Sequence, residues 1–314
     1  MIQSLTGRWQ ATQVEEPDVP TPRDGGERRL DATVPGCIHM DLLSASRIPD
    51  PFYGFNDVEV QWVAETNWLF RRTFDCAEGL RAKNRVELVC LGLDTFATVT
   101  LNGVEVGRAD NMFRTWRWEV TELLKDGDNE LTVLFESPAA CTRSLAEKDE
   151  LDLRAGFEAS RIYGRKAQYA SGWDWGPDLN TSGIWRPIYL EGYDRARLSD
   201  VWARVEWDDP SAPLVHVEVD LHAVKPCRAA LRAELKGSGE VHEGSASAEL
   251  AEGSNELVTS FRVEEPQRWW PAGMGPQNLY ELDVEVDVAG ETLAARQQVG
   301  LREVRLVREP DEQG

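Results

Sequence analysis

Short runs of alternating apolar and polar residues dominate the chain. In its first half they cover residues 68–74, 85–91, 97–101, 130–135 and 185–190. Successive side chains of a strand point to opposite faces of its sheet, so each run predicts a strand with one buried face. The dipeptide Asn102-Gly103 lies between residues 97–101 and the short run 104–106. Because both of its residues tolerate positive φ, it predicts a tight hairpin.

The second half of the chain repeats this pattern at a more even spacing. Alternating runs cover residues 201–207, 214–222, 229–235, 256–263, 279–288 and 301–307, with turn-forming residues between them. Helical patterns are few: residues 40–45 predict one helical turn, and the charged segment 143–159 predicts a short helix or a loop. Strands that follow one another without intervening helices favour antiparallel sheets, and hence an all-β fold of sandwiches or barrels.

The length of 314 residues predicts two domains, since a domain usually has about 150 residues. The composition changes near residues 192–199. Residues 1–194 are rich in tryptophan and in loops, and we expect them to form the first domain. Residues 195–308 contain evenly spaced strands over roughly 110 residues, which is typical of an immunoglobulin-like β-sandwich.

The charge of the chain excludes some classes of partner. The 34 basic and 55 acidic residues give a net charge of −21, which is spread over both predicted domains. Nucleic acids and anionic membrane surfaces require a basic face, so neither is expected as a partner. No run of about 20 apolar residues is present to cross a membrane. The first residues lack the apolar segment of a signal peptide, so we expect a cytoplasmic protein.

Cysteines, histidines and known motifs point to no cofactor. The five cysteines are scattered and odd in number, which favours free thiols in a reducing compartment. The four histidines form no cluster at metal-ligand spacing, so no metal site is predicted. Motifs of nucleophilic hydrolases, zinc proteases and nucleotide-binding loops are absent from the sequence. We therefore expect neither a metal nor an organic cofactor.

The segment of residues 163–185 carries the most unusual side chains. It places Trp173, Asp174 and Trp175 together, with a glycine before them and Gly-Pro after them, which predicts a turn. Two indoles beside a carboxylate suit sugar recognition, because an aromatic face packs on sugar C–H groups and a carboxylate accepts hydrogen bonds from hydroxyls. A structural interpretation stays open from the residues alone, with both tryptophans in the core and Asp174 capping the turn.

A second segment, residues 34–62, contains three prolines that predict an irregular path over the surface. His39 and Asp41 lie close together in this sequence and could belong to an acid–base site. A histidine that is hydrogen-bonded within the loop is the favoured interpretation of His39. Asp50 and Tyr53 are interpreted first as polar groups that stiffen a loop, and second as contacts to a ligand.

Several motifs together resemble a known family. VPGCIHMDLL, IPDPFYGFND, VQWVAETNWLFRRTF, RKAQYASGWDWGP and TSGIWRPIYL resemble the N-terminal domain of β-mannosidases, which belong to the glycoside hydrolase group of β-galactosidase and β-glucuronidase. DTFATVTLNGVEVG resembles the sugar-binding jelly roll of that group, and RWWPAGMGPQNLYEL resembles its immunoglobulin-like second domain. The resemblance implies a galactose-binding-like jelly-roll sandwich followed by an immunoglobulin-like sandwich.

The resemblance also implies an activity and a missing part. The family removes terminal non-reducing β-D-mannose with retention, using two glutamates whose carboxyl groups lie about 5–5.5 Å apart. Both glutamates belong to a (β/α)8 barrel of about 250 residues that follows the second sandwich. Residues 309–314 are interpreted as the start of a linker to such a barrel. No catalytic residue is therefore assigned in this chain, which by itself is expected to be inactive.

In the family, a Trp-Asp pair from the jelly roll contributes to the pocket for the terminal mannose. The matching residues are Trp173, as a wall of the pocket, and Asp174, as an acceptor from mannose hydroxyls. Arg165 is a further candidate as a partner that orients Asp174, and Trp175 as a packing anchor. The expected partners are β-mannoside oligosaccharides or glycoconjugates and the catalytic barrel. Two alternatives stay open: a free-standing lectin-like protein, and a related exo-β-glucosaminidase or β-galactosidase.

Overall fold

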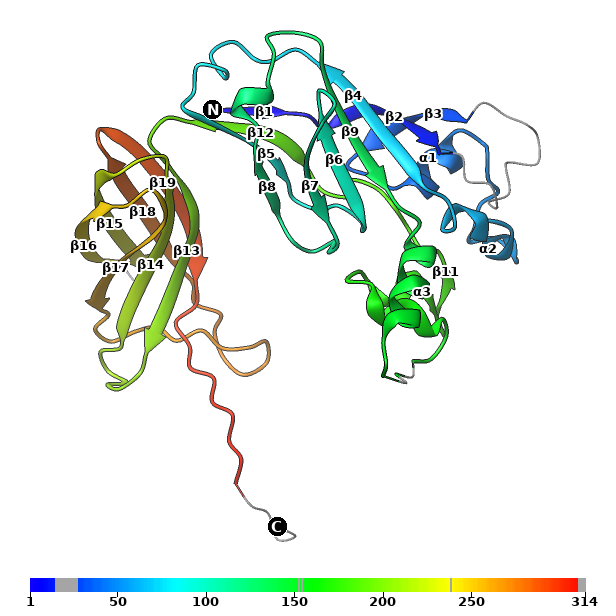
Figure 1. Ribbon diagram of the computed structural model, residues 1–314. Coiled ribbons are helices and arrows are strands. Elements are labelled where there is room, and N and C mark those ends of the chain that lie inside the picture. Colours follow the sequence, from blue (N-terminus) through cyan, green and yellow to red (C-terminus); the bar gives the residue numbers. More distant parts are fainter. Residues whose placement is uncertain (15–27, 152, 154, 238, 310–314) are drawn as a thin grey trace. The chain divides into compact units, whose positions relative to one another are not determined.

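The computed structural model describes residues 1–14, 28–151, 153, 155–237 and 239–309, and it divides the chain into two units (Figure 1). The first unit is Met1–Gly192 and the second is Tyr193–Gly314. The division lies two residues before the boundary that the composition suggested. The expected linker at residues 309–314 lies outside the described residues, apart from residue 309.

Two sheets form the sandwich of the first unit. The larger has six strands, in the order β3 (Arg29–Val34), β2 (Gly7–Gln13), β4 (Trp68–Phe74), β9 (Asn129–Phe135), β6 (Ala97–Leu101) and β7 (Val104–Ala109). The smaller has four, in the order β1 (Ile2–Ser4), β12 (Ile188–Tyr193), β5 (Arg85–Cys90) and β8 (Trp116–Glu119). Apolar side chains from both sheets form one buried core, among them Trp9, Phe70 and Leu88.

Irregular segments surround this sandwich. They contain the helices α1 (Ile38–Ser44), α2 (Asn56–Glu59) and α3 (Pro138–Lys148), and the 3-10 helices η1 (Gln61–Val63), η2 (Thr121–Leu123), η3 (Ala159–Tyr163) and η4 (Gln168–Ala170). A separate two-stranded hairpin consists of β10 (Ser171–Trp173) and β11 (Gly176–Asp178). None of the helices in the described ranges is long and apolar enough to cross a membrane.

The second unit is a sandwich of seven strands within its described part. One sheet has the order β13 (Ala196–Glu206), β14 (Leu214–Ala223) and β17 (Gly253–Arg262). The other has the order β16 (Glu240–Leu250), β15 (Cys227–Gly237), β18 (Tyr280–Val288) and β19 (Glu291–Val299). Alternate residues of the strands, such as Val217, Val219 and Val284, are buried between the sheets.

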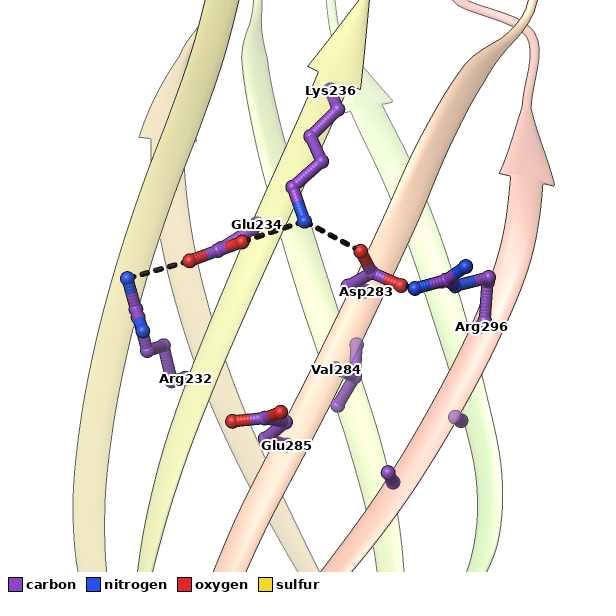
Figure 2. A pocket seen from close by; sticks show the side chains of 9 residues that line it. Arg232, Glu234, Lys236, Asp283, Val284, Glu285 and Arg296 are labelled. Carbon is purple, nitrogen blue, oxygen red and sulfur yellow. Dashed lines mark hydrogen bonds and ion pairs between the residues drawn. The ribbon is translucent and has the colours of Figure 1, made fainter.

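A charged hollow lies on the outer face of the second sheet of this unit (Figure 2). Its volume is about 440 Å³, and its side chains bind one another. Lys236 Nζ lies 2.8 Å from Glu234 and 2.7 Å from Asp283, which also pairs with Arg296 at 2.5 Å. Because these charges neutralise each other on an exposed surface, the hollow is a solvated ionic face rather than a ligand site.

Many strands lie where the alternating runs predicted them, whereas one predicted strand is absent and some observed strands were not predicted. The runs 68–74 and 97–101 coincide with β4 and β6. The strand predicted at residues 301–307 is wrong: this segment is not a strand, and Val304 and Leu306 are 84% and 86% exposed. Its alternation has no neighbouring strand to pair with. Strand β16 was missed because it is an edge strand with mostly exposed polar residues.

The helix predictions also needed adjustment. The turn expected at residues 40–45 is α1, which begins two residues earlier. Helix α3 covers residues 138–148 instead of the expected segment 143–159. It begins there because Ser137 caps it, accepting a hydrogen bond from the Ala140 N–H at 3.0 Å, and proline suits its first position.

Candidate functional site

The hairpin β10–β11 presents Trp173, Asp174 and Trp175 at its tip. Trp173 pairs with Gly176, so Asp174 and Trp175 form the two-residue connection between the strands. Gly172 has a φ of +81°, a conformation that side chains disfavour, which explains the glycine before the motif. The turn predicted from the glycines is therefore present, and it projects three consecutive large or charged side chains from the scaffold.

The indole of Trp173 is held by two side chains of the preceding segment. Its ring stacks on Phe157 with a centroid distance of 5.5 Å and an interplanar angle of 26°. The guanidinium of Arg161 lies 4.7 Å from the ring centroid, which is a cation–π contact. Trp173 is still 37% exposed. Its indole is thus fixed in direction without being part of the core.

Trp175 and Asp174 are more open. Trp175 is 70% exposed and contacts Tyr169, with ring centroids 5.7 Å apart. Asp174 is also exposed, and none of the described residues forms a hydrogen bond or ion pair with its carboxylate. These positions do not fit the structural interpretation, in which both tryptophans lie in the core and Asp174 caps the turn. The tip offers a hydrogen-bond acceptor between two exposed indoles.

No hydrogen bond or ion pair among the described residues joins Arg165 to the carboxylate that it was expected to orient. The main chain of Arg165 bonds to the loop at residues 111–112, where the Met112 N–H donates to the Arg165 oxygen at 3.0 Å. Its side chain is exposed, and no contact with Asp174 occurs within the described ranges. The arginine that contacts the motif is Arg161, which the sequence reasoning missed. Both arginines precede the motif, and sequence spacing cannot show which one turns towards it.

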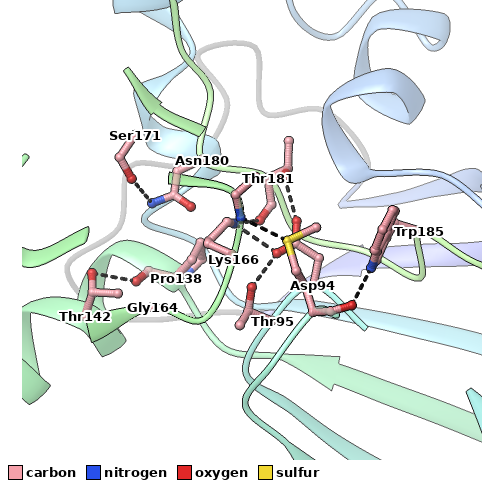
Figure 3. A network of polar contacts seen from close by, with 12 residues as sticks. Asp94, Thr95, Pro138, Thr142, Gly164, Lys166, Ser171, Asn180, Thr181 and Trp185 are labelled. Atoms are coloured by element: carbon pink, nitrogen blue, oxygen red, sulfur yellow. Dashed lines mark hydrogen bonds and ion pairs between the residues drawn. The ribbon is translucent and has the colours of Figure 1, made fainter. Parts of the chain in front are cut away.

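A buried polar network lies at the base of the hairpin (Figure 3). Lys166 Nζ lies 3.1 Å from Asp94 Oδ1, and the two side chains are 4% and 3% exposed. Lys166 also donates to the Thr181 oxygen at 2.6 Å, and the Thr181 hydroxyl donates to Asp94 Oδ2 at 2.6 Å. Sequence reasoning missed this network, although a lysine inside the motif RKAQYASGWDWGP was an available signal.

His39 and Asp41 both lie on helix α1, and both are buried. His39 is close enough to the network for the charges of Lys166 and Asp94 to act on it. His39 and Asp41 are each 6% exposed, so neither is open to a substrate. Burial, followed by the charge of Lys166, lowers the pKa of His39 to about 4. Burial raises the pKa of Asp41 to about 6, although its carboxylate accepts a hydrogen bond from the Thr33 N–H at 2.9 Å. Asp41 therefore binds a neighbouring backbone group. The interpretation of His39 as hydrogen-bonded within a loop is not supported, because it lies on helix α1 and its Nδ1 has no partner among the described residues.

The loop before helix α2 carries exposed aromatic side chains close to the hairpin. Phe52, Tyr53 and Phe55 are between 76% and 86% exposed. Asp50 stiffens the loop as expected, because its carboxylate accepts a hydrogen bond from the Phe52 N–H at 3.0 Å. The Gln61 side chain just beyond α2 donates to the Asp178 oxygen of β11 at 2.8 Å, which ties this loop to the hairpin.

The described residues around the hairpin provide no set of metal ligands. In the described part of the chain, no group of three or more His, Cys, Asp or Glu side chains could hold a metal ion. Burial, with the charges of Glu158 and Asp57, raises the pKa of Asp178 in β11. The tip is thus suited to accept hydrogen bonds from a neutral, hydroxyl-rich molecule.

Comparison with known proteins places both units in one family. Residues 9–186 match the glycosyl hydrolase 2 galactose-binding domain-like family, and residues 196–302 match glycosyl hydrolases family 2. The β-mannosidase B of Thermothelomyces thermophilus is 37% identical over 320 residues, covering 98% of this chain and 35% of that protein. The β-mannosidase B of Emericella nidulans is 33% identical over 311 residues, covering 93% of this chain and 35% of that protein.

Solved structures agree with these matches. The β-D-mannosidase of Dictyoglomus thermophilum has a TM-score of 0.91 at 35% identity, covering 100% of this chain and 38% of that chain. The exo-chitosanase of Amycolatopsis orientalis has a TM-score of 0.67 at 19% identity, covering 97% of this chain and 34% of that chain. At this low identity the likeness shows only that the two proteins share a fold.

The chain spans little more than a third of the length of the relatives it matches. The matches confirm the resemblance drawn from the motifs and the all-β class of two sandwiches. The chain therefore belongs to glycosyl hydrolase family 2, with the galactose-binding-like domain of that family followed by its immunoglobulin-like domain.

Proposed function

We propose that this chain is the N-terminal part of a retaining exo-β-mannosidase and supplies one wall of the pocket for terminal β-D-mannose. The observation that carries the proposal is the exposed carboxylate of Asp174, which lies unpaired by described residues between the indoles of Trp173 and Trp175. Similarity along the whole chain to proteins named β-mannosidase supports mannose as the sugar.

The proposed chemistry at the tip is recognition rather than bond cleavage. Asp174 accepts hydrogen bonds from two mannose hydroxyls, and such charge-assisted bonds are stronger than neutral ones. Trp173 packs against the apolar side of the ring and excludes water. The two catalytic glutamates come from a (β/α)8 barrel, where a separation of about 5–5.5 Å allows a covalent glycosyl intermediate. The five free cysteines support the cytoplasmic location that we also propose.

The test uses a chimaera in which this chain replaces the matching segment of the Thermothelomyces thermophilus relative. We expect the chimaera to hydrolyse an aryl β-mannoside, and Asp174→Ala to lower kcat/KM about a hundredfold, because two hydrogen bonds to a charged group are lost. Asp220→Ala, which removes an exposed carboxylate of the second unit, is the matched control and should leave kcat/KM unchanged. An active chimaera that is indifferent to Asp174→Ala contradicts the proposed role.

The isolated chain provides a second test. It should not turn over the aryl β-mannoside, because one wall of a pocket supplies no nucleophile. Methyl β-mannoside should bind it with a Kd above about 1 mM, because most of the pocket is absent. Saturable binding well below that concentration, lost in Asp174→Ala, would instead identify a lectin. Faster hydrolysis of aryl β-glucosaminides or β-galactosides by the chimaera would change the assigned sugar.

A further inference from the structure

The ion pair between Lys166 and Asp94 joins segments that are distant in sequence. Lys166 lies just before the hairpin, whereas Asp94 belongs to a loop between β5 and β6 of the sandwich. Asp94 is fixed through its main chain as well: its N–H donates to the Gly183 oxygen at 2.9 Å and its oxygen accepts from the Gly183 N–H at 3.0 Å. It is therefore a rigid point of the scaffold to which the hairpin segment is attached.

The ammonium of Lys166 closes this segment into a loop. It binds Asp94 and the Thr181 oxygen together, so residues 166 and 181 are held beside each other (Figure 3). The Thr181 hydroxyl completes the ring by donating to the other carboxylate oxygen of Asp94. Both strands of the hairpin and its tip lie between these two residues, so the pair attaches both ends of the segment to the sandwich. Gln61 adds a further hydrogen bond, to the Asp178 oxygen of β11.

The hairpin itself is too small to fix the direction of its tip. Each strand has three residues, with the pairs Ser171–Asp178 and Trp173–Gly176. Isolated two-stranded hairpins are marginally stable in water. The tip has no core beneath it, since Trp175 is 70% exposed. The orientation of Asp174 therefore depends on how the base of the hairpin is held.

We propose that Lys166 and Asp94 are positioning residues, which orient the hairpin that carries Trp173 and Asp174 by clamping residues 166 and 181 to the sandwich. A buried ion pair gives little stability beyond that of apolar side chains of the same volume, whereas its hydrogen bonds are directional. A clamp of defined geometry is what a sugar-binding tip requires. The inference rests on the proposed function for its effect on sugar binding, but the clamp itself can be tested without sugar.

Burial lowers the pKa of Lys166, and the charge of Asp94 opposes this shift. The histidine beside the pair carries no charge at neutral pH. His39 is the buried histidine whose pKa is lowered by burial and by the charge of Lys166. Its imidazole is accordingly neutral near pH 7 and does not compete with Lys166 for the carboxylate of Asp94.

Hydrogen exchange of the 314-residue chain tests the clamp. In Lys166→Met we expect peptides within residues 167–180 to exchange at least about tenfold faster, and to gain more than peptides from β2 and β9. Arg81→Met is the matched control, because it removes an exposed ion pair in which Arg81 Nη1 lies 2.5 Å from Asp126 Oδ1. Equal acceleration of the hairpin and the sandwich strands, or no acceleration of the hairpin, would overturn the proposal.

A milder variant tests the proposal even if Lys166→Met does not fold. Thr181→Val keeps the ion pair and removes the hydroxyl that donates to Asp94. It should accelerate exchange in the same peptides by a smaller factor. If Lys166→Met does not fold, this variant decides the outcome alone, and unchanged exchange in residues 167–180 then contradicts the clamp.

Kinetics of the chimaera test the effect on sugar binding. Lys166→Met should lower kcat/KM for the aryl β-mannoside on the order of tenfold, with most of the change in KM. The double variant Lys166→Met/Asp174→Ala should be no slower than Asp174→Ala, because both changes act through the same contact. Additive losses would show that Lys166 acts on stability instead. If Asp174→Ala leaves kcat/KM unchanged, the proposed function is wrong. Hydrogen exchange of residues 167–180 then still tests whether Lys166 and Asp94 hold the hairpin.

Discussion

The two sandwich units differ most in the polar groups that they bury. Of the sixteen buried polar or charged residues in the described part of the chain, fifteen lie in Met1–Gly192 and one, Thr259, lies in Tyr193–Gly314. The core of the second unit is built from Val, Leu, Ala and a few aromatic side chains. The first unit has an apolar core too, but it adds hydrogen-bonded networks where irregular segments join its sheets.

This difference separates the second unit from a unit that carries the candidate site. In the second unit most described residues of 196–262 and 280–299 belong to strands, and the ladders satisfy their backbone groups. The first unit must hold long irregular segments, whose backbone groups need other partners when they are buried. Buried side chains such as Lys166, Asn129 and Ser137 supply those partners. The hairpin with the candidate site is one such segment.

The largest expected effect comes from a matched pair of asparagines. Asn129 and Asn255 each bind the N–H and the oxygen of the residue four positions earlier, Lys125 and Ala251. Asn129 is 0% exposed, whereas the bonds of Asn255 lie in an exposed turn. Asn129→Ala should lower the unfolding free energy of the first unit by about 3 kcal/mol, because its partners are left without water. Asn255→Ala should cost the second unit less than about 1 kcal/mol.

Urea unfolding followed by hydrogen exchange of strands from each unit measures these two changes separately. Equal costs for the two variants would remove the distinction between the units.

The second prediction concerns the pH dependence of the first unit. The pKa of Asp41 is about 6 in the folded chain, so the folded state keeps a proton between about pH 4 and 6 that the unfolded state has lost. Folding stability therefore falls as the pH rises through this range, by up to about 3 kcal/mol. Asp41→Asn removes this cost, so its stability relative to the parent should increase by about 2–3 kcal/mol from pH 4 to pH 7.

His39 acts with the opposite sign. Its pKa is lowered to about 4, so the unfolded state binds an extra proton between about pH 4 and 6.5 and stability rises with pH there. In Asp41→Asn this rise should become visible in thermal melts at a series of pH values. A constant difference between Asp41→Asn and the parent at all pH values would contradict the raised pKa of Asp41.

A smaller effect tests the apolar core of the second unit. Val284 is 1% exposed and lies among apolar side chains. Val284→Thr keeps the shape of the side chain but buries a hydroxyl, which should cost about 1–2 kcal/mol of unfolding free energy. Val241→Thr, at a position that is 58% exposed in the same unit, is the control and should be neutral. A neutral Val284→Thr would mean that this core accepts polar groups after all.

The smallest effect is expected on the ionic face of the second unit. Asp283 pairs with Lys236 and Arg296 on the outer side of its sheet, where solvent and salt weaken such pairs (Figure 2). Asp283→Asn should leave the melting temperature unchanged at physiological salt. A clear decrease would show that the second unit, too, depends on specific polar contacts.

Local alternation was sufficient to predict most strands and the turn at the candidate site. Residues 68–74 and 97–101 became strands at the predicted positions, and Trp173, Asp174 and Trp175 lie on the predicted turn. Alternation failed where a strand has two polar faces, as in β16, or where an alternating segment has no neighbour, as at residues 301–307. In both cases the deciding factor is the presence of a pairing partner, which a local pattern does not contain.

The sequence by itself determined the all-β class and the motif with two indoles and a carboxylate, because these depend on local periodicity and residue type, while the first sandwich was expected only from the resemblance to a family. Only the tertiary structure decided which arginine contacts Trp173, and that Lys166 and Asp94 form a buried pair. Those two residues are 72 positions apart, and a charged pair becomes a clamp only when the fold removes it from water and gives it directional partners.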